Sequence, residues 1–484
     1  MFRKFWRLIT APFRLVPWYL WLAAAAVAAW FGRSILLIIA TIIAFHPIPL
    51  PPLFQGEPET VAEARLQDLR HFHHVRRNER SMTDEMRARF DARVAYLEAN
   101  AGSLTDAEFM LGLARAQAEI DNGHSNTPAT RLVARFPRLP VRMAEMDGEI
   151  RILRVRPEQQ PLLGARVERI NGVEVEELLA RFRDAYGGND AFYLTQAPAL
   201  LDAPDFLAAV DAGEADMPVR LDLTLADGET VQVLLDAEPA APDAERAFPG
   251  DLPQPWVHVT EGWVAAEPDA SPLYLQQPGR GYWMERIENT GIVYIALRTN
   301  LDDGGEESLA AFSSRVVQTL TEQPARAVVV DQRFSGGGDL TITHAMMAAL
   351  PDLVGLDGRV YLLTSGNTFS AAIVNLASAR EVAPERVLLV GEAIGDRLQF
   401  WAEGWGYELP NSGFRARYST GFYDLQNGCT GLFRCAWGSL HIFPILIEDL
   451  DVDIPAPLDW PAYIAGRDPA MDAVMAEEAR RRGR

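Results

Sequence analysis

The residues best suited to chemistry are a serine at an expected helix start and a run of glycines upstream of it. Ser370 follows the turn Ser365-Gly366-Asn367, and helix-favouring residues come directly after it. A serine hydroxyl becomes a nucleophile when a base takes its proton, and the anion formed by attack on a carbonyl needs fixed hydrogen-bond donors. Glycines 336–338 lack side chains, so their backbone can approach a substrate closely. These residue types predict nucleophilic attack on an acyl group.

Neighbouring strands are needed to bring the serine and the glycines together. Apolar runs at 327–330, 360–363 and 387–390 predict strands, and a helix is expected between the second and the third. This order of elements is the unit of a parallel sheet, in which sites lie at the carboxyl ends of the strands. The glycines follow the first strand and Ser370 the second. We therefore expect both at one edge of one α/β sheet.

Each of these features also has a plainer interpretation. A serine at a helix start most often caps the helix, and a glycine loop can cradle a phosphate or form a simple turn. The loop lacks the G-x-G-x-x-G and G-x-x-x-x-G-K spacings, which weakens a nucleotide-binding interpretation. Together the features favour an oxyanion hole formed by the N–H groups of Gly337 (or Gly338) and Ala371.

The base for the serine must come from elsewhere in the chain. Lys4 is the only lysine and precedes a long apolar segment, while arginine does not release its proton near neutral pH. His124 follows a helix expected to start at Thr105 and to end at 121–123, and the pKa of an imidazole lies close to working pH. We predict His124 as the base, although a histidine there also fits a role beside the helix dipole.

Several other residues are candidates for the orienting carboxylate or for the base itself. An orienting carboxylate is expected on the other ring nitrogen of the histidine, and Asp121, Glu403 and Asp424 are the candidates. His344 and His441 are rivals as the base. The sequence does not rank the three carboxylates.

Residues 1–55 are typical of a membrane anchor. Four basic residues precede an apolar stretch at 18–45, which Gly32-Arg33 interrupts. A charge at a helix centre costs about 2.5–3.5 kcal/mol, so we expect either one span with Arg33 near an interface or two short spans. The basic amino end favours an inside start, which for one span places the remainder on the extracytoplasmic, or periplasmic, side.

Composition excludes some partners. The 484 residues with 48% hydrophobic content are enough for two or three domains, and the net charge of −21 argues against a nucleic-acid partner. Cys429 and Cys435 are too few for a tetrahedral metal site; they form either a short disulfide or two separate buried thiols. We expect no metal and no cofactor.

Five motifs occur in the order found in a known family. They are DNGHS (121–125), LLGARVERINGVEV (162–175), VVVDQRFSGGGD (328–339), LTSGNTFSAA (363–372) and GRDPAMDAVM (466–475). This arrangement resembles the tail-specific, or C-terminal processing, serine peptidases. Many members pair the serine with a lysine in a Gly-Lys-Gly element, but the corresponding stretch 391–397 contains no lysine. The resemblance is therefore to a histidine-type variant.

The resemblance implies an α/β fold with a ClpP/crotonase-like core and hydrolysis of peptide bonds in unfolded or C-terminal segments. The expected parts are a membrane anchor (1–55), an N-terminal helical region contributing to the site (56–138), a PDZ-like module (139–238), a linker (239–280), the peptidase core (281–465) and a C-terminal helix (466–484). Two other hypotheses remain: a pseudo-peptidase that binds peptide without cutting it, and a crotonase-like enzyme acting on an acyl thioester.

Overall fold

The structure is a computed structural model that describes residues 32, 56–240, 261–355, 357–429, 431, 434–436 and 445–483. The expected anchor, apart from Gly32, and the rival base His441 lie outside these residues. Within the described part of the chain, no helix is both long and apolar enough to cross a membrane.

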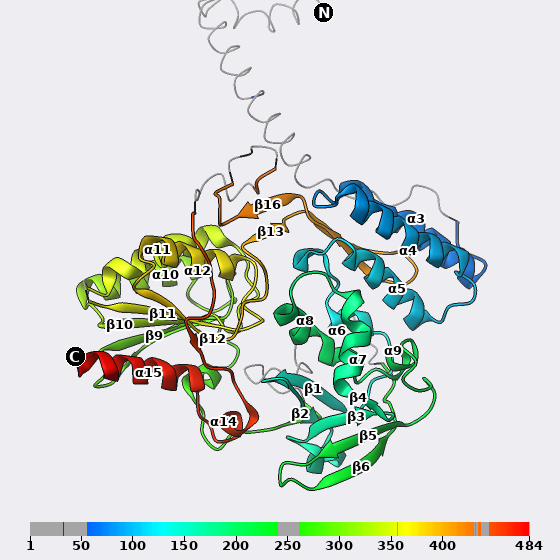
Figure 1. The fold of residues 1–484 in the computed structure, drawn as a ribbon, viewed down its shortest axis with the longest axis horizontal. Coiled ribbons are helices and arrows are strands. Elements are labelled where there is room, and N and C mark those ends of the chain that lie inside the picture. Colours follow the sequence, from blue (N-terminus) through cyan, green and yellow to red (C-terminus); the bar gives the residue numbers. More distant parts are fainter. Residues whose placement is uncertain are drawn as a thin grey trace, which may run out of the picture.

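A six-stranded sheet carries the turn that contains Ser370, called the serine turn below (Figure 1). Its spatial order is β17 (Ile454–Pro455), β12 (Val387–Gly391), β11 (Arg359–Thr364), β10 (Ala327–Asp331), β9 (Ile292–Leu297) and β8 (Tyr282–Ile287). All neighbours run parallel except β8 and β9. Strands β9 and β10 are buried along their whole length, as apolar runs in a parallel sheet covered on both faces must be. The three strands predicted from apolar runs are confirmed.

Helices cover both faces of this sheet. Figure 1 shows α10 (Leu309–Glu322), α11 (Leu340–Leu353) and α12 (Ala371–Val382) on one face and α15 (Pro469–Arg482) on the other. Phe312 and Met347 are buried on the first face, whereas Met471 and Val474 of α15 pack on the second. Helix α14 (Trp460–Ile464) precedes α15. The mixed α/β class expected from the sequence is confirmed.

A second sheet lies below helix α8 (Asp190–Gln196) in Figure 1. Its main path is β1 (Val141–Met146), β2 (Glu149–Val155), β3 (Arg166–Ile170), β5 (Val219–Thr224) and β6 (Thr230–Leu235), with β4 (Val173–Glu174) on β3 and β7 (Val264–Ala265) on β2. The expected hairpin over 219–235 is present as β5 and β6. Strand β7 falls within 239–280, so part of the range expected to be a linker belongs to this sheet.

Short helices fill the connections around this sheet. They are α6 (Ala129–Val133), η2 (Pro157–Leu162), α7 (Val175–Phe182), η3 (Arg183–Ala185), α8 (Asp190–Gln196), η4 (Ala197–Leu200), α9 (Pro204–Ala208) and η5 (Leu273–Leu275).

Three longer helices form the amino-terminal region: α3 (Val61–Asn78), α4 (Asp84–Ala99) and α5 (Asp106–Ala118). The predicted start of α5 is confirmed, because Thr105 and Glu108 form a reciprocal capping box. Asp121 takes the left-handed conformation with φ 51°, which ends the helical course before the turn η1 (Gly123–Ser125). That turn carries His124.

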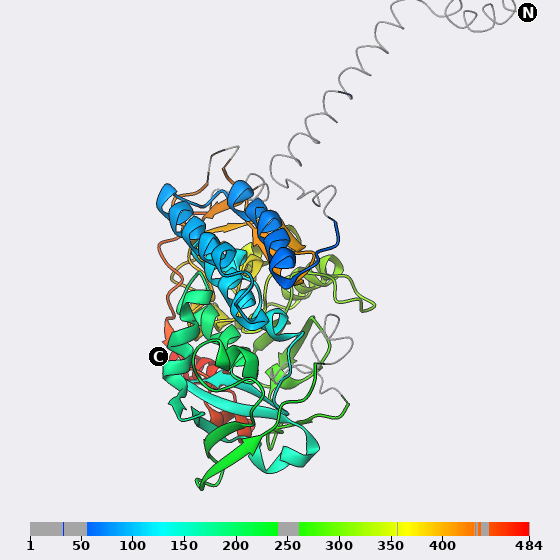
Figure 2. The same cartoon turned by 90° about the vertical axis from the view of Figure 1, so that its right-hand side faces the viewer.

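A long arm joins the core to these helices. It pairs β13 (Gln399–Ala402) with β16 (Gly421–Asp424) and β14 (Trp405–Glu408) with β15 (Arg415–Tyr418). Figure 1 shows it leaving the core sheet towards α3, and Figure 2 shows the helices in front of it. This arm is not predictable from the sequence pattern, because four-residue strands give little periodic signal.

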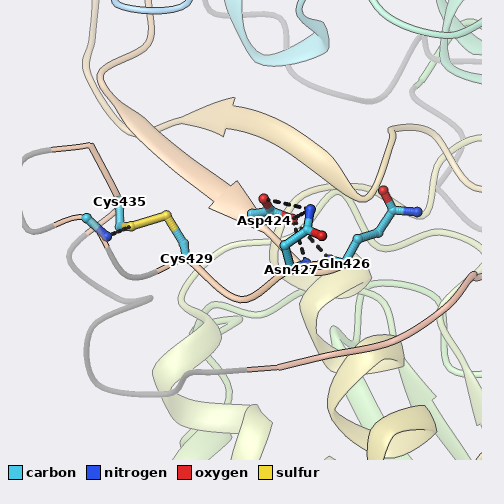
Figure 3. Close-up of a disulfide and its surroundings, with 6 residues drawn as sticks. Asp424, Gln426, Asn427, Cys429 and Cys435 are labelled. Carbon is cyan, nitrogen blue, oxygen red and sulfur yellow. Dashed lines mark hydrogen bonds between the residues drawn. A yellow bond between two sulfur atoms is a disulfide. The ribbon is translucent and has the colours of Figure 1, made fainter.

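The two cysteines lie beyond β16. Cys429 and Cys435 form a disulfide with a Cα–Cα distance of 5.7 Å (Figure 3). Asp424 stands just before it and accepts hydrogen bonds from the backbone N–H groups of Gln426 and Asn427. Of the two alternatives left open by the sequence, the structure contains the disulfide.

Candidate active site

Ser370 occupies a strained turn between β11 and α12. Its backbone has φ 56° and ψ −123°, and its side chain makes no capping hydrogen bond to the helix. A non-glycine residue in such a conformation costs about 1–3 kcal/mol and persists only where its surroundings enforce it. The plainer interpretation of Ser370 as a helix cap therefore does not describe its geometry. A sharp strand-to-helix turn of this kind presents a serine hydroxyl for attack.

Hydrogen bonds to the neighbouring strand end hold the turn in place. The N–H of Phe369 donates to the carbonyl of Ser335 at 3.0 Å, and the hydroxyl of Thr368 donates to the carbonyl of Gln332 at 2.9 Å. Arg333 in that segment is buried and bonds to both Asp331 and Asp468, the residue that caps α15. The serine turn and the glycine loop are thus one rigid unit.

The glycine loop packs directly against Ser370. Gly337 has φ +95°, and a Cβ atom placed on it would lie 2.7 Å from the Cβ of Ser370 and 2.8 Å from the N atom of Ala371. The N–H groups of Gly337, Gly338 and Ala371 donate to no backbone or side-chain acceptor in the described structure. Unused donors beside a serine can receive the oxyanion of a tetrahedral intermediate.

An oxyanion-hole role for Gly337 predicts that Gly337→Ala lowers kcat for peptide hydrolysis by about 10²- to 10³-fold, the effect of taking one such donor out of position. The added methyl group would push against Ser370 and Ala371 and would meet an unfavourable φ. Steady-state hydrolysis of fluorescein-labelled β-casein measures the effect. Gly336→Ala is the matched control, because a Cβ at Gly336 meets no atom within 4 Å, and equal losses in both variants would contradict the role of Gly337.

His124 lies against the same turn. Its side chain is buried, with the residue 7% exposed. Its ring stacks on Phe400 at a centroid distance of 5.2 Å and lies tilted against Phe369 at 4.3 Å. Phe369 directly precedes Ser370, and Phe400 belongs to β13 of the arm. The fold therefore brings the turn after an early helix against Phe369, the residue next to Ser370; the pairing of the imidazole with the Ser370 hydroxyl stays a prediction.

The carboxylate beside His124 is that of Asp396. Its Oδ2 atom lies 3.3 Å from Nδ1 of His124, and Asp396 is only 4% exposed. The preceding residue, Gly395, donates its N–H to the carbonyl of Thr368 at 2.9 Å, which fixes the loop after β12 against the serine turn. With Nδ1 facing Asp396, the Nε2 atom remains as the basic atom of the ring. Neither nitrogen makes a standard hydrogen bond within the described structure.

Burial and the nearby carboxylate of Asp396 change the pKa of His124 in opposite directions. Desolvation is the larger effect and lowers the pKa of His124, while Asp396 raises it. Glu403 also raises this pKa and Arg417 lowers it, both at longer range. The net pKa lies below the ordinary 6.5, so His124 is neutral and able to accept a proton at pH 7.

A role of His124 as general base predicts how the rate should depend on pH, given that its pKa is lowered. Because a protonated imidazole cannot act as a base, kcat/KM should fall with decreasing pH through the pKa of free His124. This acid limb should have its midpoint below 6.5, since the pKa is lowered in the folded protein. A pH series of casein hydrolysis between 4.5 and 8, at about constant ionic strength, provides the measurement. A midpoint above 6.5 would contradict a buried neutral base.

Comparison with solved structures places the fold. A crystal structure of mature CPAF has a TM-score of 0.56 at 12% identity, covering 88% of this chain and 99% of that one. CPAF complexed with lactacystin gives 0.54 at 13% identity, covering 87% and 99%. The chain shares the fold of CPAF. The photosystem II D1 C-terminal processing protease covers 84% and 98% at 15% identity, but its TM-score of 0.34 is too low to support an argument. No sequence-family model and no curated protein matches the chain.

The other predicted carboxylates lie elsewhere in this CPAF-like fold. Asp121 forms an ion pair with Arg397 at 2.9 Å and accepts a hydrogen bond from the N–H of Gly188. Glu403 accepts one from the Tyr423 hydroxyl at 2.6 Å, and Asp424 caps the turn after β16. The carboxylate beside Nδ1 of His124 is therefore that of Asp396, and not that of Asp121, Glu403 or Asp424, as we expected.

The sequence does carry a signal for Asp396. It lies in the stretch 391–397, directly after a strand end, where residues of a parallel sheet reach a site. The rival base His344 is half-buried on α11, and burial lowers its pKa. In the described part of the chain, no group of histidine, cysteine and acidic residues could hold a metal ion.

Proposed function

We propose that this protein is a serine endopeptidase in which Ser370 is the nucleophile, His124 the general base and Asp396 the carboxylate that orients it. The single observation that carries the proposal is the left-handed, non-capping conformation of Ser370 beside Gly337. Such strain has no structural purpose in a plain helix start, whereas it exposes a nucleophilic hydroxyl. The likeness to CPAF supports the fold on which this arrangement rests.

The reaction follows from the positions of the groups. Nε2 of His124 takes the proton of the Ser370 hydroxyl as the oxygen attacks the peptide carbonyl. The N–H groups of Ala371 and of Gly337 or Gly338 bind the resulting oxyanion. His124 then gives the proton to the leaving amine, and water hydrolyses the acyl-enzyme by the same steps. Asp396 stabilises the imidazolium that forms between these steps.

The substrates we propose are unfolded or C-terminal segments of proteins. A pocket of about 550 Å³ supports this, because Ser365, Gly366 and Asn367, which precede Ser370 in the chain, line it together with residues of strand β1 and helix α8. Strand β1 ends the spatial order of its sheet and has β2 as its one described neighbour. An unpaired strand edge can bind an extended peptide through main-chain hydrogen bonds. This is consistent with a PDZ-like module beside a ClpP/crotonase-like core.

We further propose that residues 1–55 anchor the protein in a membrane, with the catalytic part on the extracytoplasmic side. The basic residues before the apolar stretch 18–45 support both proposals. The full chain should stay in the membrane fraction after carbonate extraction, and deletion of 1–55 should release it. Alkaline phosphatase fused after residue 60 should be active; an inactive, well-expressed fusion would contradict the orientation.

Labelling with a fluorophosphonate tests the nucleophile. The reagent should modify wild-type protein once, at Ser370, as mapped by mass spectrometry of the digested protein. Ser370→Ala should remove the label, and Ser365→Ala in the same turn should retain it. Labelling that survives in Ser370→Ala would exclude Ser370 as the nucleophile.

A catalytically inactive peptide-binding protein is the second candidate. One observation favours it: no hydrogen bond joins the Ser370 hydroxyl to His124 in the described structure. In enzymes without substrate this bond is often long and tightens only on binding. Binding of denatured β-casein without labelling or cleavage would favour this candidate over the peptidase.

A further inference from the structure

Glu79 is a buried carboxylate that the catalytic steps do not use. It ends helix α3, outside the core sheet, and it is only 1% exposed. Its Oε1 atom accepts hydrogen bonds from the N–H and the hydroxyl of Ser81 at 3.0 and 2.7 Å. Its Oε2 atom accepts from the Ser125 hydroxyl and the Ser419 N–H, both at 2.8 Å. Removing a carboxylate from water costs free energy, so a carboxylate is buried only where hydrogen-bond donors occupy its acceptor sites.

The Oε2 side of Glu79 connects to the general base. Ser125 directly follows His124 in the turn η1, and Ser419 lies in the arm between β15 and β16. The two serine hydroxyls lie 2.9 Å apart, and the side-chain amide of Asn122 donates to both at 3.0 and 3.1 Å. One carboxylate therefore ties together the end of α3, the His124 turn and the arm.

The directions of these hydrogen bonds favour one charge state of the Glu79 carboxylate. The Ser125 hydroxyl donates to Glu79, so it accepts from Asn122 and from the Ser419 hydroxyl. Glu79 receives donors at both oxygens, an arrangement that an ionised carboxylate satisfies and an amide cannot. Burial raises the pKa of Glu79, and these hydrogen bonds oppose that change.

We infer that Glu79 is a positioning residue for the general base, acting through Ser125 to hold the His124 turn against the serine turn. This inference rests on the proposed function. The arm contributes at two points, because the Ser419 hydroxyl is hydrogen-bonded to that of Ser125 in the turn, while Phe400 stacks on the His124 ring. If the turn shifts, Nε2 moves relative to Ser370, and a displacement near 1 Å is enough to reduce catalysis about 10²-fold.

A matched pair of serine variants isolates the effect. Ser125→Ala removes the hydroxyl on the Oε2 side, whereas Ser81→Ala removes the equivalent hydroxyl on the Oε1 side and leaves the His124 turn bonded. Glu79→Gln completes the set, because its amide group must face a backbone N–H at one of the two sites. The readouts are kinact and KI for fluorophosphonate labelling of the full-length protein.

We expect kinact to fall about 10- to 100-fold in Ser125→Ala and Glu79→Gln with KI unchanged, and to stay within about twofold in Ser81→Ala. Labelling at long times should reach the wild-type stoichiometry in all three, which separates misplacement from unfolding. The pH midpoint of the labelling rate should rise towards 6.5 in Ser125→Ala, because a loosened turn admits water to His124 and its neighbours Asp396, Glu403 and Arg417.

Three results would each overturn the inference. They are a wild-type kinact in all three variants, an equal loss of kinact in all three, or a reduced labelling stoichiometry with a normal kinact for the sites that are labelled. If Glu79→Gln fails to fold, Ser125→Ala against Ser81→Ala decides alone, because each removes one hydroxyl. The proposed function fails separately, when Ser370→Ala is still labelled. Labelling at Ser370 with wild-type kinact in Ser125→Ala would refute Glu79 as a positioning residue and leave the peptidase intact.

Discussion

Replacing His124 with alanine should lower kcat/KM for casein hydrolysis by about 10⁴- to 10⁶-fold, the range for loss of a catalytic histidine. Without the imidazole, the Ser370 hydroxyl loses its proposed base. Arg397 stays protonated near neutral pH, and Lys4, which precedes the apolar stretch 18–45, is the only lysine in the sequence. The fluorophosphonate kinact should fall in parallel, because the same proton must leave. KM should change by less than about threefold, since the ring packs against Phe369 and Phe400 and is largely covered.

Combining His124→Ala with Ser370→Ala tests whether the two residues act in the same catalytic step. Groups that act as one unit lose their function together, so His124→Ala with Ser370→Ala should be no less active than Ser370→Ala alone. His344→Ala is the control, a half-buried histidine on α11 whose loss should leave activity within about twofold. An additive loss in the double variant, or a larger loss in His344→Ala, would identify another base.

The sequence predicted those features that local signals encode. Strands β10, β11 and β12 are apolar runs, and the turn before Ser370 and the glycines after β10 are short local patterns. Parallel pairing then brings the two strand ends to one edge, so their meeting required no long-range information. His124 is predicted as the base by elimination, because the sequence contains no lysine after Lys4, and this role stays a prediction.

Features that depend on three-dimensional packing were not predictable in the same way. Asp396 reaches His124 only because the loop after β12 folds back onto Thr368, 28 residues before it. The strained φ of Ser370 depends on Gly337 and on the hydrogen bond from Phe369 to Ser335, none of which is local to the helix start. The arm pairs four-residue strands whose stability comes from α3 and η1 rather than from their own sequence.

Converting Asp396 to asparagine should lower kcat by about 10³- to 10⁴-fold with little change in KM. An asparagine amide group can donate to Nδ1, which favours the tautomer with hydrogen on Nε2, and that tautomer cannot accept the serine proton. The residual activity should also have its acid limb at lower pH, because Asp396 raises the pKa of His124 and the amide removes that charge.

Asp121→Asn and Glu403→Gln separate this effect from a general loss of negative charge. Asp121 holds Arg397 at the surface and Glu403 bonds Tyr423, so each neutral variant should stay within about tenfold of wild type. Of the two, only Glu403→Gln should shift the acid limb downward, since Glu403 but not Asp121 acts on the pKa of His124. A loss in Glu403→Gln as large as that in Asp396→Asn would move the orienting role to Glu403, whose carboxylate would then have to leave Tyr423 when substrate binds.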